Sequence, residues 1–188
     1  MRVGLLGGTF DPPHNAHVLC AQYTLDELQL DKVIFIPSGD HPFKRHAVVA
    51  SANDRYTMVQ LAIKDHPKFE VSDIEIKRHG ITYTIDTIEQ IKGNHPDWEL
   101  YLLIGADNIA DFERWHRHED ILQQVTVVVF YRTTVDPITP AAHFLFPQTP
   151  IIDISSTEIR SLIKADESIE HLVPAEVAEY IESHALYS

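Results

Sequence analysis

The sequence predicts an α/β protein with a Rossmann-like, doubly wound parallel sheet. Short apolar runs rich in Val, Ile and Phe alternate with longer segments of helical period, which is typical of a parallel sheet covered by helices on both faces. The length of 188 residues and the content of 44% hydrophobic and 23% charged residues fit one globular domain. We therefore expect a single domain over residues 1–188, with a small C-terminal helical portion from about 155 to 188.

Six apolar runs predict the strands of this sheet. They are residues 3–6, 32–37, 69–76, 100–104, 125–131 and 151–154. Runs this short, with little polar alternation, are typical of strands that are buried on both faces.

Helices are expected between these strands. Apolar side chains recur at spacings of three and four over residues 17–30 and again after Ser51. Ser51 and Ser155 each stand three residues before an acidic residue, so each is a candidate N-cap. Pro174 is expected in the first turn of a last amphipathic helix that includes residues 177–184.

Two segments lack periodicity and are rich in Pro and polar residues. Residues 38–50 are interpreted as a candidate active-site lid, and residues 133–150 as a long connection.

The charge balance excludes several classes of partner. The chain has 15 Lys and Arg against 28 Asp and Glu, a net charge of −13, which disfavours nucleic acid and anionic membranes. The one cysteine, Cys20, cannot form an internal disulfide, and no uncharged apolar stretch reaches about 18 residues. These features predict a cytoplasmic protein that binds small molecules.

The most informative segment is GGTFDPPHNAH at residues 7–17, between the first strand and the first helix. Gly7 and Gly8 allow a ligand to approach the backbone, and the helix N-terminus beyond them favours an anion. His14 and His17 lie three residues apart, so both can face that anion and donate hydrogen bonds to phosphoryl oxygens. The alternative is an ordinary glycine turn with two surface histidines.

Other phosphate and metal motifs do not fit. The chain lacks GxGxxG, GxxxxGK[ST] and HExxH patterns, and the charged residues 116–120 are interpreted as a solvated face. We predict no metal site built from protein side chains alone.

A second candidate phosphate site is ISSTEIR at residues 154–160, where hydroxyl groups and a guanidinium group meet at an expected helix start. A capping box explains Ser155 and Glu158 equally well. It requires neither the run of three hydroxyl groups nor Arg160.

Taken together, these two motifs resemble the paired signature of the nucleotidylyltransferase superfamily, and in detail that of bacterial nicotinate-mononucleotide adenylyltransferases. The segments TYTIDT at 82–87 and IGAD at 104–107, Trp115, and the segment 172–187 resemble the same family in order and spacing. The resemblance covers essentially the whole chain.

This resemblance implies an ATP site at the first strand-to-helix turn, with the pyridine nucleotide beside it. The residues implied for the ATP phosphates and ribose are Gly7, Gly8, Thr9, Phe10, His14, His17, Ser155, Ser156, Thr157 and Arg160. Those implied for the mononucleotide are Trp115 under the pyridine ring, the amides around Thr84 at its carboxylate, and Gly105 and Asp107 near the sugar-phosphate portion. His14, His17, Lys44 and Arg160 are the implied catalytic residues.

Two positions depart from the family pattern. Ala16 stands where relatives usually carry Gly, and we expect its methyl group to be tolerated. Phe43 stands where relatives commonly carry His, next to Lys44, which matches and is expected to meet the departing phosphates.

The implied reaction is adenylyl transfer from ATP to nicotinate mononucleotide, which forms nicotinate adenine dinucleotide and releases pyrophosphate in NAD biosynthesis. Mg²⁺ is the expected cofactor, held mainly by ATP oxygens and water. The alternatives are a transferase acting on another phosphorylated acceptor such as phosphopantetheine, a non-catalytic nucleotide sensor, and a metal-binding histidine module. The oligomeric state stays open, with a homo-oligomer as one outcome.

Overall fold

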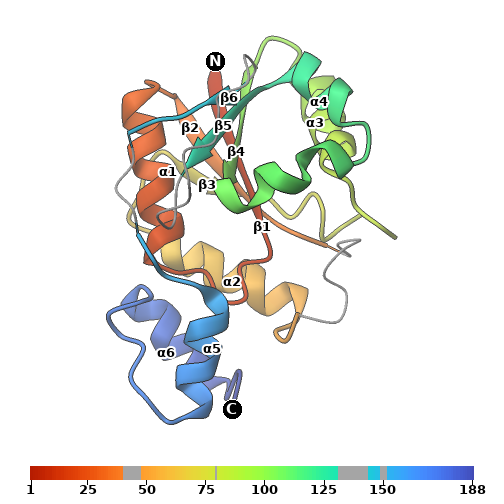
Figure 1. Cartoon of the computed structure of the whole chain (residues 1–188). Coiled ribbons are helices and arrows are strands. Elements are labelled where there is room, and N and C mark those ends of the chain that lie inside the picture. Colours follow the sequence, from red (N-terminus) through yellow and green to blue (C-terminus); the bar gives the residue numbers. More distant parts are fainter. Residues whose placement is uncertain (40–47, 79, 131–143, 149–151) are drawn as a thin grey trace.

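The computed structural model describes residues 1–39, 48–78, 80–130, 144–148 and 152–188. Within these residues, no helix is both long and apolar enough to cross a membrane. Figure 1 shows a central sheet with helices packed on both faces, and two further helices below one end of it.

The sheet confirms the expected fold class. Its six strands run in the order β3-β2-β1-β4-β5-β6, and every neighbouring pair is parallel. The strands are β1 (Arg2–Gly8), β2 (Lys32–Pro37), β3 (Phe69–Val71), β4 (Glu99–Gly105), β5 (Thr126–Phe130) and β6 (Phe144–Leu145). This order is that of the doubly wound dinucleotide-binding fold, whose ligands bind where the strand order reverses, outside the carboxyl ends of β1 and β4.

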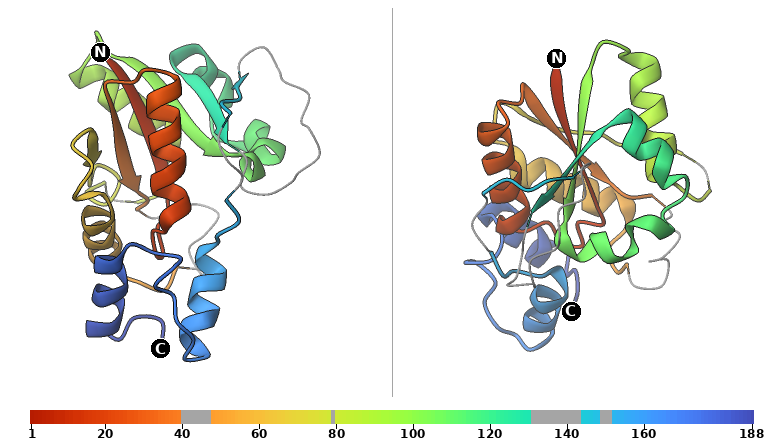
Figure 2. Two further views of the ribbon diagram at one scale, coloured as in Figure 1. Left: turned by 90° about the vertical axis from the view of Figure 1, so that its left-hand side faces the viewer. Right: turned by 45° about the horizontal axis from the view of Figure 1, so that its top comes forward.

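Helices from the connections cover the sheet (Figure 2). The described helices are α1 (Asn15–Glu27), α2 (Ala52–Ile63), α3 (Thr84–Asn94), the 3₁₀ helix η1 (Ala106–Arg114), α4 (His118–Gln124), α5 (Ser156–Lys164) and α6 (Ala175–Ser183). Of these, α5 and α6 are the two that lie below the end of the sheet. The serines expected as N-caps do cap α2 and α5: Ser51 accepts a hydrogen bond from the Asp54 amide and Ser155 from the Glu158 amide, each at 3.1 Å.

Two apolar cores lie on opposite faces of the sheet because successive strand residues point to opposite sides. In β1, Val3 and Leu5 belong to the core shared with α3 and α4, whereas Leu6 belongs to the core shared with α1, α2 and α6. Gly4 lies where strand and loop are tightly packed: a Cβ there would be 3.1 Å from the side chains of Leu30 and Val33.

The C-terminal helices are joined to the sheet domain by polar contacts. The Asn15 amide at the start of α1 donates to the Leu172 carbonyl at 2.9 Å. In α6, the Tyr180 hydroxyl donates to Asp54 of α2 at 2.9 Å. These bonds attach residues 155–188 to the carboxyl edge of the sheet, below β1 in Figure 1.

Two strand predictions were wrong: the third strand in its extent and the sixth in its position. The third strand ends at Val71 instead of continuing to residue 76, because the chain turns and the Lys77 amide bonds to the Asp73 carbonyl. Residues 152–154 form no strand; the Ile154 amide bonds to the Ile152 carbonyl, and Ile154 packs against the apolar core. The sixth strand is instead β6, inside the segment interpreted as a connection.

Candidate functional site

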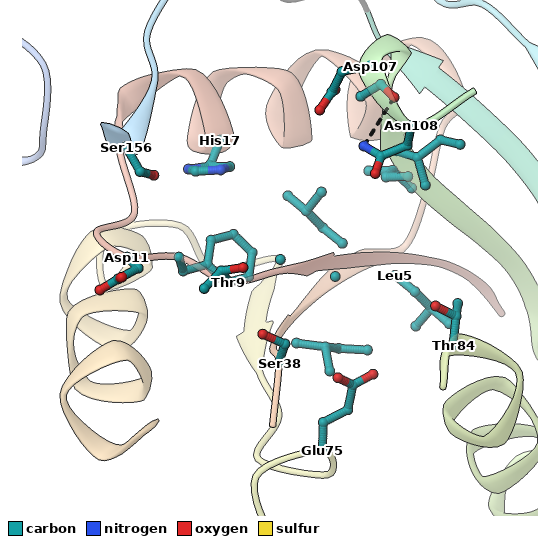
Figure 3. A pocket seen from close by; sticks show the side chains of 18 of the residues that line it. Leu5, Thr9, Asp11, His17, Ser38, Glu75, Thr84, Asp107, Asn108 and Ser156 are labelled. Carbon is teal, nitrogen blue, oxygen red and sulfur yellow. Dashed lines mark hydrogen bonds between the residues drawn. The ribbon is translucent and has the colours of Figure 1, made fainter. Parts of the chain in front are cut away.

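A cavity of about 390 Å³ opens at the carboxyl ends of β1 and β4, a volume that is typical of small-molecule sites. Its walls come from the turn after β1, the start of α5, the start of α3 and η1 (Figure 3). The structure therefore brings residues 7–11 and 155–160, far apart in the sequence, to one end of a single cavity.

The glycine pair at the end of β1 performs two different tasks. A Cβ at Gly7 would meet no protein atom within 4 Å and would extend into the cavity that Gly7 lines. A Cβ at Gly8 would lie 3.0 Å from the ring of Phe10, which is buried and has a left-handed backbone with φ of 52°. Gly7 thus leaves space for a ligand, and Gly8 leaves space for Phe10.

The two histidines have unequal positions. His17 lines the cavity, whereas His14 does not; the His14 ring is fully buried and stacks on the His17 ring with centroids 3.6 Å apart. The His14 amide donates to His17 Nδ1 at 3.2 Å. Because Nδ1 accepts this bond, the ring proton of neutral His17 belongs on Nε2, from which it can be donated to a ligand.

The start of α5 faces the same end of the cavity. Arg160 donates to the Asp11 carbonyl at 2.7 Å and to the Thr157 hydroxyl at 3.3 Å. The Ser156 hydroxyl donates to the Pro12 carbonyl at 2.8 Å. Ser155 uses its oxygen as the helix cap, and its hydroxyl proton remains available to a second partner.

The residues implied for the pyridine nucleotide lie at the other end of the cavity. Thr84 is the first residue of α3, and Gly105, Asp107 and Trp115 belong to or flank β4 and η1; all four line the cavity. Trp115 is partly buried and packs on Phe112 with ring centroids 5.3 Å apart. An indole face held in this way suits an aromatic ligand.

Sequence reasoning missed Arg55, a buried cation behind the phosphate-facing turn. Its guanidinium donates to the Thr9 and Ser38 carbonyls, both at 2.7 Å, and so ties the turn after β1 to the end of β2. Burial lowers the pKa of Arg55, partly offset by the charge of Asp11. The sequence held one signal of its burial: Arg55 stands three and four residues before Met58 and Val59, which are buried on the same face of α2.

Glu75 was also missed. It lines the cavity and accepts a hydrogen bond from the Thr87 hydroxyl of α3 at 2.9 Å. Burial raises the pKa of Glu75, which the bonds from Thr87 and the Gly39 amide partly oppose. Gly39 is required at its position, because a Cβ there would lie 2.3 Å from the Glu75 carbonyl oxygen.

The expected lid, residues 38–50, falls largely outside the described residues, as do Phe43 and Lys44. The structure describes residues 38–39 and 48–50 of this segment. Residues 49 and 50 are held by Asp11, whose carboxylate accepts hydrogen bonds from the Val49 amide at 2.8 Å and the Ala50 amide at 3.0 Å.

Comparison with known proteins fits this geometry. The cytidylyltransferase-like family matches residues 5–162. A probable nicotinate-nucleotide adenylyltransferase of Clostridium tetani is 39% identical, over 97% of either chain. One from Bacillus pumilus is also 39% identical, over 99% of this chain and 98% of the relative. The chain belongs to the nicotinate-nucleotide adenylyltransferase family.

A solved structure supports the fold of this adenylyltransferase. Plasmodium falciparum nicotinic acid mononucleotide adenylyltransferase, complexed with APC, superposes with a TM-score of 0.81 at 20% identity, covering 99% of this chain and 96% of that one. The family assignment and the doubly wound sheet are thus confirmed. The roles of individual residues in this adenylyltransferase stay predictions.

Proposed function

We propose that this protein transfers the adenylyl group of ATP to nicotinate mononucleotide, forming nicotinate adenine dinucleotide and pyrophosphate. The observation that carries the proposal is the meeting of residues 7–11, His17 and residues 155–160 at one end of a cavity whose other end is formed by Thr84, Asp107 and Trp115. One end offers donors for a polyphosphate, and the other offers an aromatic face and helix amides for a pyridine carboxylate.

In this reaction the phosphate oxygen of the mononucleotide attacks the α-phosphorus of ATP in line with the departing pyrophosphate. One P–O bond forms as another breaks, and no covalent enzyme intermediate is needed. Both reactants are anions, so the protein aligns them and stabilises the charge on the transferring group. His17 Nε2 and the Arg160 guanidinium are the groups that we assign to this task, with His14 orienting His17 through its amide.

Mg²⁺ is part of the proposal. Among the described residues, no three His, Cys, Asp or Glu side chains cluster closely enough to hold a metal alone. We propose that the ion is held mainly by ATP oxygens and water, where it would neutralise polyphosphate charge. Asp107, which lines the cavity, is a candidate to contact the water shell of the ion. We further propose that Lys44 meets the departing phosphates and that the enzyme works in the cytoplasm.

The test is pyrophosphate release from ATP and Mg²⁺ with each acceptor in turn. We expect release with nicotinate mononucleotide and none with phosphopantetheine. Nicotinamide mononucleotide in the same assay measures how much the pyridine carboxylate contributes. ATP binding without pyrophosphate release for any acceptor would contradict the proposal and favour a nucleotide sensor.

A second prediction separates the two ends of the cavity. Trp115→Ala should raise the KM for the mononucleotide about tenfold, the usual scale for losing a stacked ring, and leave the KM for ATP almost unchanged. Trp98→Ala is the matched control, because Trp98 stacks on His95 just before β4, at the amino end of that strand and away from the cavity at its carboxyl end. Equal changes in both KM values for Trp115→Ala would indicate a core role instead.

A further inference from the structure

Tyr187, the penultimate residue of the sequence, reaches the turn that faces the phosphate end of the cavity. Its hydroxyl donates to Asp11 Oδ1 at 2.8 Å across 176 positions of sequence, and its ring is buried in the core beneath α1 and α2. The segment that carries it is unusual: Ala185 and Tyr187 both have left-handed backbones, with φ of 48° and 70°. Non-glycine residues persist in this conformation when their surroundings fix them.

Asp11 is the residue on which these contacts converge. Its buried carboxylate accepts three hydrogen bonds, from the Val49 amide, the Ala50 amide and the Tyr187 hydroxyl. Its carbonyl oxygen accepts the bond from Arg160. A buried carboxylate needs such donors, so the loss of one leaves Asp11 undersatisfied and free to shift.

The Tyr187 hydroxyl stays a donor at all ordinary pH values. Burial raises the pKa of Tyr187, and the charge of Asp11 raises it further, while Arg160 and Arg55 lower it. Asp11 therefore lies among a phenol and two guanidinium groups.

We propose that Tyr187 is a positioning residue for the ATP end of the active site: by holding Asp11, it fixes the carbonyl group that orients Arg160 and the chain at residues 49–50. This proposal rests on the proposed function. It gives the C-terminal segment a part in the reaction, through Asp11 and Arg160, although Tyr187 does not line the cavity.

The test is Tyr187→Phe, which removes one oxygen atom and keeps the buried ring. We expect the KM for ATP to rise about tenfold, the scale of losing a hydrogen bond to a charged group, and the KM for nicotinate mononucleotide to stay unchanged. The asymmetry follows because Asp11 and Arg160 lie at the phosphate end, away from Trp115. A purely structural role would not separate the two KM values.

Tyr180→Phe is the matched control. It removes the same kind of bond, from a tyrosine of α6 to the carboxylate of Asp54 at 2.9 Å, and Tyr180 does not line the cavity. Both variants should lower the melting temperature by similar amounts, and only Tyr187→Phe should raise the KM for ATP. Identical kinetics for the two variants, with active wild-type protein, would overturn the proposal.

A double variant tests whether Tyr187 acts through Asp11 and Arg160. If Tyr187 acts by orienting Arg160, Tyr187→Phe should change the KM for ATP less than twofold once Arg160→Ala is present. A full tenfold rise in that background would overturn the proposed route. Wild-type protein that releases no pyrophosphate from ATP and nicotinate mononucleotide would instead contradict the proposed function itself, and this proposal with it.

Discussion

Helices α1 and α5 both begin at the same end of the cavity, but their first turns are built differently. At α1 the N-cap is the buried His14, the first turn holds no acidic residue, and His17 closes the cap with its own ring. At α5 the N-cap is the exposed Ser155, and Glu158 stands in the first turn.

Under the proposed function, this difference would assign one helix start to the ligand and the other to the fold. An acidic side chain in the first turn offsets the positive end of the helix dipole, so α5 is partly neutralised and α1 is not. The start of α1 therefore keeps more of its attraction for an anion. Helix α5 instead holds Arg160, whose guanidinium donates to the Asp11 carbonyl in the turn after β1.

The largest effect should come from the α1 side. His17→Ala should lower kcat by about 10²-fold, the usual scale for losing one donor to the transition state, with the fold retained. Steady-state pyrophosphate release measures this change in kcat. His95→Ala is the control, because His95 is an exposed residue between α3 and the amino end of β4, away from the cavity. A near wild-type rate in a folded His17→Ala protein would remove His17 from the catalytic groups.

A smaller effect is expected on the α5 side. Arg160→Ala should lower kcat/KM for ATP about tenfold, because one charge-assisted hydrogen bond to phosphate is lost and the Asp11 carbonyl loses its donor. Lys164→Ala removes a positive charge one turn later in the same helix and should leave this constant unchanged. Equal losses in the two variants would mean that only the net charge of α5 matters.

The smallest effect should come from the cap itself. Ser155→Ala and Ser51→Ala should each cost about 1 kcal/mol of unfolding free energy, the usual value of an N-cap, measured by chemical denaturation. Only Ser155→Ala should also raise the KM for ATP, by about threefold, because its hydroxyl lines the cavity. If Ser155→Ala changes stability alone, α5 is an ordinary capped helix with one functional arginine.

Sequence patterns predicted the parts of this molecule that depend on local chemistry. The alternation of apolar runs and helical segments predicted the sheet, and the caps at Ser51 and Ser155 follow from short-range hydrogen bonds. The apolar residues in 151–154 led to a wrong strand prediction. Ile154 packs against the apolar core without pairing in the sheet.

The missed residues share a physical cause. Arg55, Glu75 and Tyr187 take their importance from partners that are distant in the sequence, such as the Thr9 carbonyl, the Gly39 amide and the Asp11 carboxylate. Arg55 had one local signal, its helical spacing with Met58 and Val59, but that spacing does not identify its partners. Only the tertiary fold brings these three side chains to those partners.

The two tryptophans of the chain lie at opposite ends of the strands: Trp115 is in the cavity wall at the carboxyl ends, and Trp98 is just before the amino end of β4. Replacing Trp98 by phenylalanine would leave a single indole chromophore, located where the proposed pyridine ring would stack. The intrinsic fluorescence of Trp115 in that protein would then report how much nicotinate mononucleotide is bound, without any attached dye.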